Sequence, residues 1–366
     1  MFTLHKTDEH TQARLGTLKL AHGDVQTPIF MPVGTVGSVK TMVPEDLHGM
    51  GAEIILGNTY HLYIRPGLEV IREFGGLHGF VNWDKPILTD SGGFQIFSLA
   101  NQRKIDETGA HFQSHLDGKK IHLTPELAVE IQETLGADIH MVLDECTAGT
   151  ATYEEARRSM RRSMRWAARS RAARTRTELA QFGIVQGCMF EDLRTESIES
   201  LTAMNFEGYS IGGLSVGESK PDMRRITKHC CDRLPQEKPR YLMGVGTPLD
   251  LIESIAVGVD MFDCVMPTRN GRNGTLFTSK GRVNIKNTRY RLDKGPLDEN
   301  CKCYTCQNFS LSYLRHLFMA KEYTGQRLLT LHNLTYYLEL IREIRAAIAA
   351  GTFHELLKHH QGLWES

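Results

Sequence analysis

The chain contains 366 residues, 41% of them hydrophobic, and its 43 lysines and arginines balance 43 aspartates and glutamates. A formal net charge of zero excludes a global field that drives the protein onto nucleic acid or membranes, so local patches must bind any polyanionic partner. The first residues lack the apolar core of a signal peptide, and no run approaches the ~20 apolar residues of a membrane span, which predicts a cytoplasmic protein.

Short apolar runs recur along the chain, and segments with helical periodicity separate them. Strands that alternate with helices predict parallel βαβ units, and eight such strands are the number that closes a (β/α)8 TIM barrel of the α/β class. A doubly wound open sheet is the alternative arrangement of the same units. The eight runs cover residues 27–34, 52–58, 85–93, 138–146, 182–187, 208–214, 240–246 and 259–265.

Two of the helices between the strands carry clear start signals. In TPELAVEIQETLG, Thr124 stands at the N-cap and Pro125 at the first helical position, and apolar residues follow one turn apart. TPLDLIESIAVG repeats this device from Thr247. Both segments are therefore predicted to be helices that connect strands.

Two insertions interrupt this rhythm. Residues 111–123 alternate around an Asp-Gly turn, which predicts a β-hairpin after the third strand. A second hairpin is predicted around His22, Gly23 and Asp24, where it would cap the floor of the barrel. The rhythm stops after residue 275. We therefore expect a barrel with its catalytic mouth in residues 1–275, and a basic, cysteine-containing subdomain with C-terminal helices, packed on the barrel, in residues 276–366.

Polar residues stand where several predicted strands end. The run ILTDSGGFQ contains Asp90, while Asp144, Gln186 and Asp263 end strands 4, 5 and 8, and the pair Gly212–Gly213 ends strand 6. Catalytic groups of such barrels lie at the carboxyl ends of the strands, so three carboxylates are expected to meet at one mouth. Each aspartate alone could simply cap the following helix, but together they favour an active site.

Two kinds of chemistry fit such carboxylates. A pair about 5 Å apart suits double displacement at an anomeric carbon, with a nucleophile and a proton shuttle, whereas wider spacing suits direct attack by water. Asp144, Gln186 and the backbone at Gly213 suit recognition of a purine such as guanine, because a carboxylate accepts from adjacent N–H donors and an amide meets the carbonyl. The residues alone leave the choice between displacement and hydrolysis open.

Three of the eight cysteines lie close together in CKCYTC, at Cys301, Cys303 and Cys306. Thiols of a cytosolic protein stay reduced, so this spacing predicts a metal site rather than disulfides. A histidine that completes a Cys3His set would form a closed, structural zinc (Zn) site. His332, in LTLHNLTYYLEL at a predicted helix start, is the favoured fourth ligand, and His316 is nearer in sequence. We expect one structural zinc per chain, outside the barrel.

Basic residues cluster in two regions. Nine arginines lie between Arg157 and Arg176, four of them in an i, i+4 stripe, a pattern more typical of a solvated helix face than of a nucleic-acid contact. PTRNGRNG follows soon after Asp263 and places Arg269 and Arg272 among flexible residues beside the expected site. Further lysines and arginines lead from there to the cysteine cluster, an arrangement that could guide a phosphate backbone into the mouth.

These motifs together resemble one family. TDSGGFQ, LDEC, IVQG, GGLSVGE, LMGVGTP, DMFDCVMPTRNGRNG and CKCYTC followed by His332 cover essentially the whole chain. The set closely resembles the bacterial tRNA-guanine transglycosylases, or queuine tRNA-ribosyltransferases. The resemblance implies a barrel with a zinc-binding subdomain that acts as a homodimer. It also implies exchange of guanine at wobble position 34 of tRNAs with GUN anticodons for the 7-deazaguanine preQ1 in queuosine biosynthesis, by double displacement through a covalent enzyme–RNA intermediate.

The resemblance further implies roles for individual residues. Asp263 resembles the nucleophile that attacks ribose C1′, and Asp90 resembles the general acid and base. Residues that resemble base-binding positions are Ser91, Gly92, Gly93, Phe94, Asp144, Gln186, Gly213, Leu214 and Met243. Residues that resemble the tRNA-contacting loops are Gly244, Val245, Gly246, Thr247, Pro248, Leu249, Asp250, Thr268, Arg269, Asn270, Gly271 and Arg272. Residues that resemble the zinc ligands are Cys301, Cys303, Cys306 and His332.

Two residues bear on the substrate. Val216 and Cys146 resemble the bacterial pattern, in which bulk near the pocket suits preQ1, with its small aminomethyl group, better than queuine. The competing classes are a barrel hydrolase, metal-dependent or acting on glycosides, and a pure RNA-binding module. No His-x-His ends an early strand, which disfavours a metal-dependent hydrolase, and the three acids disfavour a pure RNA-binding module.

Overall fold

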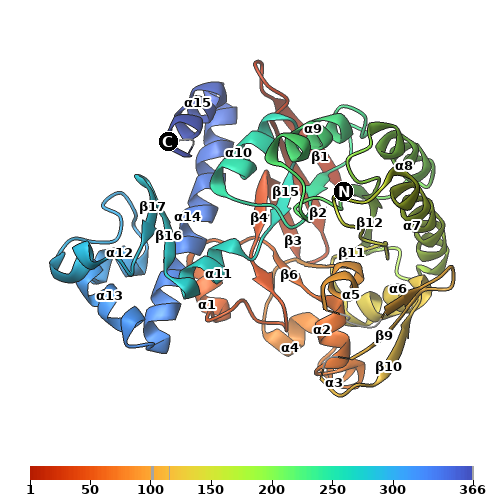
Figure 1. Cartoon of the computed structure of the whole chain (residues 1–366), viewed down its shortest axis with the longest axis horizontal. Helices are drawn as coiled ribbons and strands as arrows, with labels where there is room; N and C mark the ends of the chain where they lie inside the picture. Colours follow the sequence, from red (N-terminus) through yellow and green to blue (C-terminus); the bar gives the residue numbers. More distant parts are fainter. Residues whose placement is uncertain (100–102, 115, 365–366) are drawn as a thin grey trace.

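Nine short parallel strands form a ring at the centre of the computed structural model, which describes residues 1–99, 103–114 and 116–364 (Figure 1). Two of them, β4 and β5, are halves of one stretch that Pro32 interrupts; β4 pairs with β15 and β5 with β6, which closes the ring. The eight predicted strands and the barrel are confirmed, and the alternative prediction of a doubly wound open sheet is wrong. The strands are β4 (Ile29–Met31), β5 (Val33–Gly34), β6 (Ile55–Gly57), β7 (Ile87–Thr89), β11 (Ile139–Met141), β12 (Ala180–Val185), β13 (Gly208–Ile211), β14 (Arg240–Leu242) and β15 (Met261–Asp263).

The barrel strands are apolar runs because both of their faces are buried, one in the barrel interior and one under the surrounding helices. Every residue of β12 and β13 is buried, and Phe30, Phe182 and Phe262 are completely covered. The connecting helices are α1 (Pro44–Gly49), α2 (Thr59–Ile64), α3 (Leu68–Glu73), α4 (Leu77–Val81), α5 (Gly93–Leu99), α6 (Pro125–Leu135), α7 (Tyr153–Ala173), α8 (Glu191–Ala203), α9 (Lys220–Cys231) and α10 (Pro248–Ala256).

The predicted helix starts at Thr124 and Thr247 are confirmed. The hydroxyl of Thr124 accepts a hydrogen bond from the Leu127 amide at 3.1 Å, and Thr247 accepts one from the Asp250 amide at 3.2 Å. Proline follows each threonine at the start of its helix. These caps satisfy amides that the first turn of a helix leaves unpaired, so the local sequence determines where α6 and α10 begin.

The early hairpin lies at the floor of the barrel, as expected. It consists of β2 (Arg14–Leu20) and β3 (Gly23–Thr27), and β1 (Phe2–Thr7) extends it to a three-stranded antiparallel sheet. The Arg14 guanidinium donates to Asp260, and the His22 amide donates to Asp138 at 2.9 Å. Since Asp260 and Asp138 immediately precede β15 and β11, these bonds tie the sheet to the amino ends of barrel strands.

The predicted insertion after the third strand is also confirmed as a hairpin. β9 (Ala110–Gln113) and β10 (Lys120–Leu123) pair antiparallel on either side of the turn at Asp117 and Gly118. His115, within the predicted range, lies outside the described residues. A third strand, β8 (Arg103–Ile105), pairs with β9 and was not predicted, because three residues give too short a pattern to identify.

The chain beyond β15 departs from the alternation of strands and helices, as predicted, but the prediction for its first segment was wrong. Residues 267–274 were expected to be flexible, whereas α11 is a helix with proline in its first turn and Gly274 as a left-handed C-cap. The segment comprises α11 (Met266–Asn273), β16 (Thr275–Thr278), β17 (Gly281–Asn284), the 3₁₀ helix η1 (Thr288–Leu292), α12 (Tyr304–Asn308), α13 (Leu311–Met319), α14 (Tyr323–Ala350) and α15 (Phe353–Trp364).

Helix α14 connects this C-terminal segment to the barrel. It packs against α11, β4 and β16, while α12, α13 and the β16–β17 hairpin lie on its far side from the barrel (Figure 1). The Asn333 amide donates to the carbonyls of Pro267 and Thr275, and the Tyr337 hydroxyl donates to Gly246 O at 3.0 Å. Within the described ranges, no helix has the length and apolar character needed to cross a membrane.

Candidate active site

A cavity of about 520 Å³ opens at the carboxyl ends of the barrel strands. Three aspartates from three strand ends line it: Asp90 follows β7, Asp144 follows β11, and Asp263 ends β15. The structure therefore brings the three predicted carboxylates together at one mouth. Their environments differ, and these differences determine what each carboxylate can do.

The carboxylate of Asp90 is the most elaborately bound of the three. It is 8% exposed and accepts hydrogen bonds from Asn58 Nδ2 at 2.6 Å, Gln95 Nε2 at 2.7 Å and the Thr59 amide at 2.8 Å. Burial raises the pKa of Asp90 to about 6, although these bonds oppose the rise, and the charge of nearby Asp263 adds to it. A carboxyl group with such a pKa can both donate and accept a proton near neutrality.

Asp263 is held through one oxygen. Its Oδ1 accepts from the Tyr241 hydroxyl at 2.6 Å and from the Gly244 amide at 2.8 Å. No donor in the described part of the chain reaches Oδ2, which leaves this oxygen open to the cavity. Burial raises the pKa of Asp263 above the usual aspartate value, and the two hydrogen bonds partly offset the rise. An oriented carboxylate with one open oxygen is suited to nucleophilic attack.

Asp144 is shared between the cavity and the barrel interior. It accepts from Ser91 Oγ at 3.0 Å and from Gln186 Nε2 at 2.7 Å. Burial raises its pKa, against the lowering effect of the bonds from Gln186 and Ser91. Gly93 must be glycine, because a Cβ there would stand 2.5 Å from the Asp144 carbonyl oxygen. The carboxylate is thus fixed in place as an acceptor for donors in the cavity.

The expected base-binding residues divide into two groups. Gln186 is 2% exposed and lies behind Asp144 rather than on the cavity wall, and Gly93 is likewise set back. Those that line the cavity are Ser91, Gly92, Phe94, Asp144, Gly213, Leu214 and Met243. Val216 and Cys146, which the sequence linked to substrate size, also line it.

The sequence did not single out three residues that hold the carboxylates: Asn58, Gln95 and Tyr241. Asn58 directly follows β6, so the rule that polar residues at strand ends are functional could have identified it. Gln95 stands in the ILTDSGGFQ run, five residues after Asp90. Tyr241 is an interior residue of β14 and reads as an ordinary apolar strand position, so no local signal identifies it.

The expected tRNA-contacting segments lie beside the cavity with most of their side chains covered. Gly244, Gly246, Asp250, Arg269 and Asn270 line the cavity. Arg269 is exposed, whereas Arg272 is half-buried with Nη1 unpaired in the described structure. Buried or half-buried residues away from the cavity wall are Val245, Thr247, Pro248, Leu249, Thr268 and Gly271.

The arginine stripe of α7 is largely neutralised by ion pairs. Arg161 pairs with Glu196 and Arg165 with Glu107, both bidentate, and Arg169 pairs with Glu126 at 2.7 Å. A cation that already faces a carboxylate attracts phosphate less strongly. The stripe therefore fits the expected solvated helix face.

The three cysteines of CKCYTC and His332 form a compact group whose ligand atoms all lie within 4.8 Å of one another. His332 Nδ1 lies 3.3 Å from Cys306 Sγ, and Nε2 donates to the Phe277 carbonyl at 2.8 Å. The second bond fixes the tautomer that leaves Nδ1 free for a metal, so the group fits a tetrahedral Cys3His site. His332 lies inside α14 rather than at a helix start, because the buried apolar run around Leu328 and Leu329 belongs to the same helix.

A second group with metal-ligand chemistry, His22, His78 and Asp138, lies at the barrel floor. His22 Nδ1 lies 2.9 Å from Asp138 and His78 Nε2 lies 3.2 Å from it, and His78 Nε2 also lies 3.1 Å from the Lys85 carbonyl. A ring nitrogen between a carboxylate and a carbonyl carries a hydrogen. This group is therefore a hydrogen-bonded anchor.

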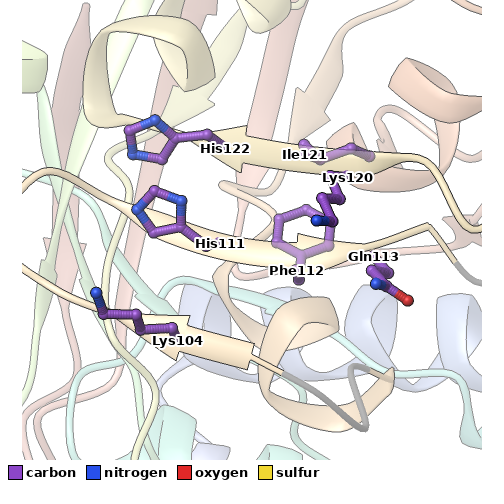
Figure 2. A pocket seen from close by; sticks show the side chains of 7 residues that line it. All are labelled: Lys104, His111, Phe112, Gln113, Lys120, Ile121 and His122. Carbon is purple, nitrogen blue, oxygen red and sulfur yellow. The ribbon is translucent and has the colours of Figure 1, made fainter.

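A hollow of about 570 Å³ lies on the sheet of β8, β9 and β10. Figure 2 shows the side chains that line it. His111 and His122 are cross-strand partners, and their stacked rings have centroids 3.9 Å apart. Lys104 pairs with His111 across the strands, and Lys120 lies farther along β10, near Phe112. None of the described residues that line this hollow is a carboxylate, so it lacks the acid and base groups of the main cavity.

Comparisons with known proteins agree on one family. The family model described as "Queuine tRNA-ribosyltransferase" matches residues 8–366. A protein of that name from Neisseria meningitidis is 58% identical over 354 residues, which cover 96% of this chain and 95% of that protein. Proteins of the same name from Oleidesulfovibrio alaskensis and Dechloromonas aromatica are 57% and 59% identical, over 99% and 97% of this chain and 96% of each relative.

Proposed function

The chain belongs to the queuine tRNA-ribosyltransferase family, and from this premise we propose that it replaces guanine at wobble position 34 of tRNAs with GUN anticodons by preQ1. As a member of this family it is a pentosyltransferase that acts on tRNA guanine in the queuosine pathway. The double displacement, the covalent intermediate and the choice of preQ1 belong to the proposal.

The observation that carries the proposal is the pairing of two unlike carboxylates in one cavity. Asp263 has an oriented carboxylate with one open oxygen, whereas Asp90 has a pKa of about 6. A nucleophile and a proton shuttle are the two groups that exchange at an anomeric carbon requires. The wobble nucleotide must leave its stack for C1′ to reach them.

In the first displacement, Oδ2 of Asp263 attacks C1′ of the ribose and the C1′–N9 bond breaks. The electron pair of that bond passes to guanine N9, which takes a proton from Asp90. The products are a ribosyl ester on Asp263, free guanine and an ionised Asp90. Burial of the ester in the cavity limits the access of water to it.

In the second displacement, Asp90 takes the proton from the corresponding ring N–H of preQ1. The ring nitrogen attacks C1′, the ester bond breaks, and Asp263 leaves as a carboxylate. Asp90 is protonated again and the cycle closes. One glycosidic bond replaces another, so the exchange needs no nucleotide triphosphate and no redox cofactor.

We assign recognition of the base to the other polar groups of the cavity. Asp144 accepts from the adjacent N–H donors of guanine or preQ1, and the amide of Gly213 meets the carbonyl. Ser91 and Gln186 hold Asp144, while Gly92, Phe94, Leu214 and Met243 surround the ring. Val216 and Cys146 restrict the space at the wall and favour the small aminomethyl group of preQ1 over queuine.

The remaining assignments concern the RNA and the assembly. We propose that residues 244–250 and 268–272 contact the anticodon loop, with Arg269 as the exposed cation. Residues 276–366 would form a subdomain in which Cys301, Cys303, Cys306 and His332 hold one structural zinc. Zinc there would cross-link the segment and take no part in the chemistry. A homodimer located in the cytoplasm completes the proposal.

Base exchange with labelled guanine and tRNA tests the function. Incorporation of label into intact tRNA supports transglycosylation, whereas loss of guanine without incorporation would indicate a hydrolase. Asp263→Asn should abolish the denaturation-resistant protein–RNA adduct while tRNA binding persists, because the amide keeps the shape but lacks the nucleophilic charge. The matched variant Asp90→Asn should slow turnover. Ribose found on Asp90 by mass spectrometry would reverse the two roles.

Competition between preQ1 and queuine tests the choice of base. The wild type should incorporate preQ1 preferentially, and Val216→Gly should widen acceptance because it removes a steric rejection. Equal incorporation of both bases by the wild type would contradict the preference for preQ1.

A further inference from the structure

Arg194, on α8, is a completely buried arginine that no carboxylate of the described residues neutralises. Among the residues that the structure describes, its guanidinium donates only to backbone carbonyls: Nη1 to Val185 O and Gly212 O, both at 2.8 Å, and Nε to Cys188 O at 3.0 Å. Nη2 is buried without a hydrogen-bond partner in the described structure. Burial of an unpaired cation is costly, so its position needs a reason.

Two of the three carbonyls that Arg194 binds belong to the ends of two neighbouring strands at the cavity. Val185 ends β12, and Gly212 follows β13 and lines the cavity. Gly187 permits the close approach of α8, because a Cβ at that position would lie 2.9 Å from the Arg194 backbone nitrogen. Arg194 therefore joins the two strand ends from behind the cavity wall.

The important carbonyl is that of Gly212, because it shares a peptide unit with the amide of Gly213. Gly213 lines the cavity, and its N–H donates to no acceptor among the described residues. Its φ of +64° favours glycine, and a Cβ would lie 2.5 Å from Gln186 Oε1. The unpaired N–H is thus held rigidly at the wall, opposite the carbonyl that receives the charged hydrogen bond.

A cation that donates to the oxygen of a peptide unit draws electron density from its nitrogen and strengthens the N–H as a donor. A donor already fixed in position stabilises charge without reorganisation. Both effects act on the Gly213 amide through the Gly212 carbonyl. The side chain itself does not reach the cavity, since Arg194 is completely buried and does not line it.

We propose that Arg194 is a positioning residue that orients and polarises the Gly212–Gly213 peptide, so that its N–H binds the carbonyl oxygen at ring position 6 of guanine or preQ1. The inference rests on the proposed base exchange. It explains how the amide already assigned to the 6-carbonyl is held and strengthened, and it assigns a purpose to a buried cation. In the first displacement the same N–H stabilises negative charge on the departing guanine.

Inhibition by two free bases tests this role. Guanine carries the 6-carbonyl and 2-aminopurine lacks it, and the inhibition constant of each is measured against labelled base. Arg194→Lys and Arg194→Gln should raise the inhibition constant of guanine about tenfold, the effect of losing one charge-assisted hydrogen bond. They should change the inhibition constant of 2-aminopurine by less than about twofold. The lysine cannot bridge both carbonyls, and the glutamine lacks the charge.

Arg240 provides the matched control. It is also buried, and its guanidinium donates to the carbonyls of Leu234 and Gly258 near the amino end of β14, away from the cavity. Arg240→Lys should leave the ratio of the two inhibition constants unchanged. An equal loss for both bases in the Arg194 variants would overturn the proposal and make Arg194 a residue that supports only the fold.

A wild-type measurement covers the case in which the variants do not fold. In protein labelled with 15N at arginine guanidinium groups, the water-protected Arg194 resonances should shift when guanine binds and stay in place with 2-aminopurine. No shift with saturating guanine would overturn the inference. Failure of the wild type to exchange guanine at all would instead refute the proposed function, so the two failures are distinguishable.

Discussion

The hydroxyl of Tyr241 donates a 2.6 Å hydrogen bond to Oδ1 of Asp263, across two neighbouring barrel strands. The Gly244 amide binds the same oxygen at 2.8 Å. Together they hold the carboxylate in one orientation and direct Oδ2 toward the cavity. In the proposed mechanism, this buried tyrosine determines which oxygen of Asp263 attacks.

Replacement of Tyr241 by phenylalanine should slow adduct formation roughly 10- to 100-fold, the effect of losing one hydrogen bond to a charged group. The substitution removes a bond that lowers the pKa of Asp263, so the pKa should rise further and the loss should be greatest at low pH. Single-turnover experiments at several pH values measure the rate of adduct formation. Tyr209→Phe is the control, since Tyr209 packs against Phe206 and does not line the cavity. Equal slowing in both variants would contradict the orienting role.

The pKa of Asp90 predicts opposite pH dependences for the two displacements. The first needs the protonated acid, so its rate should fall as pH rises through about 6; the second needs the carboxylate, so its rate should rise over the same interval. The two steps can be measured separately. The first is the rate of adduct formation without an added nucleobase, and the second is the rate at which added guanine releases the RNA from the adduct. Asp90→Asn should lose both dependences. A common direction for the two steps would exclude Asp90 as the shuttle.

Arg269 should contribute a salt-dependent contact with tRNA. It is exposed at the edge of the cavity, and its replacement by alanine should raise the KM for tRNA and reduce the slope of affinity against salt by about 1. Arg161→Ala is the matched control, because Arg161 is exposed but pairs with Glu196. An unchanged slope in Arg269→Ala would show that this arginine does not bind phosphate. Arg272, which is half-buried, should have the smaller effect.

Wild-type protein should contain one zinc per chain, and Cys303→Ala should lose it. Because binding free energy at such a site is folding free energy, the variant should also unfold at lower temperature. Elemental analysis and thermal unfolding provide the measurements. Cys230→Ala, a buried cysteine of α9, should retain the metal. Full zinc content in Cys303→Ala would mean that the group is not the site.

Asp138 should stabilise the barrel floor through its charge. Burial alone would raise its pKa, but hydrogen bonds from His78, the Ile87 amide and His22 outweigh burial and lower the pKa to about 2. A pKa lowered in the folded state contributes stability above the unfolded value of 3.8, lost as pH falls from there to about 2.

Asp138→Asn should therefore reduce the free energy of unfolding by ~2 kcal/mol at pH 7, and by less as pH falls below 4. Urea unfolding at several pH values measures the difference. Asp84→Asn should change little, because Asp84 is 81% exposed and its ion pair is with the side chain of His48. A loss for Asp138→Asn that stays constant from pH 7 to pH 3 would attribute the effect to shape rather than charge.

Local signals in the sequence determined the barrel and the position of its chemistry. Buried parallel strands must be short apolar runs, and helices must satisfy their first amides, so the eight strands and the caps at Thr124 and Thr247 could be predicted from a few neighbouring residues each. Strand ends of a barrel meet on one side, so the sequence by itself predicts that Asp90, Asp144 and Asp263 lie together. The CKCYTC spacing identified the candidate metal-ligand cluster, because closely spaced thiols can bind one ion.

Contacts between distant parts of the chain decided the rest. Burial sets the pKa of Asp90, and Asn58 and Tyr241 orient two carboxylates from neighbouring strands, so these effects require the packed barrel. The helix α11 packs against α14. Position 271 must be glycine for this close packing, because a Cβ there would lie 2.8 Å from Thr330 Cα. Gln186 lies behind Asp144 rather than on the cavity wall, because its side-chain amide donates a hydrogen bond to the Asp144 carboxylate. Sequence patterns record which residues are apolar, charged or turn-forming, whereas orientation and desolvation arise only when separate segments pack together.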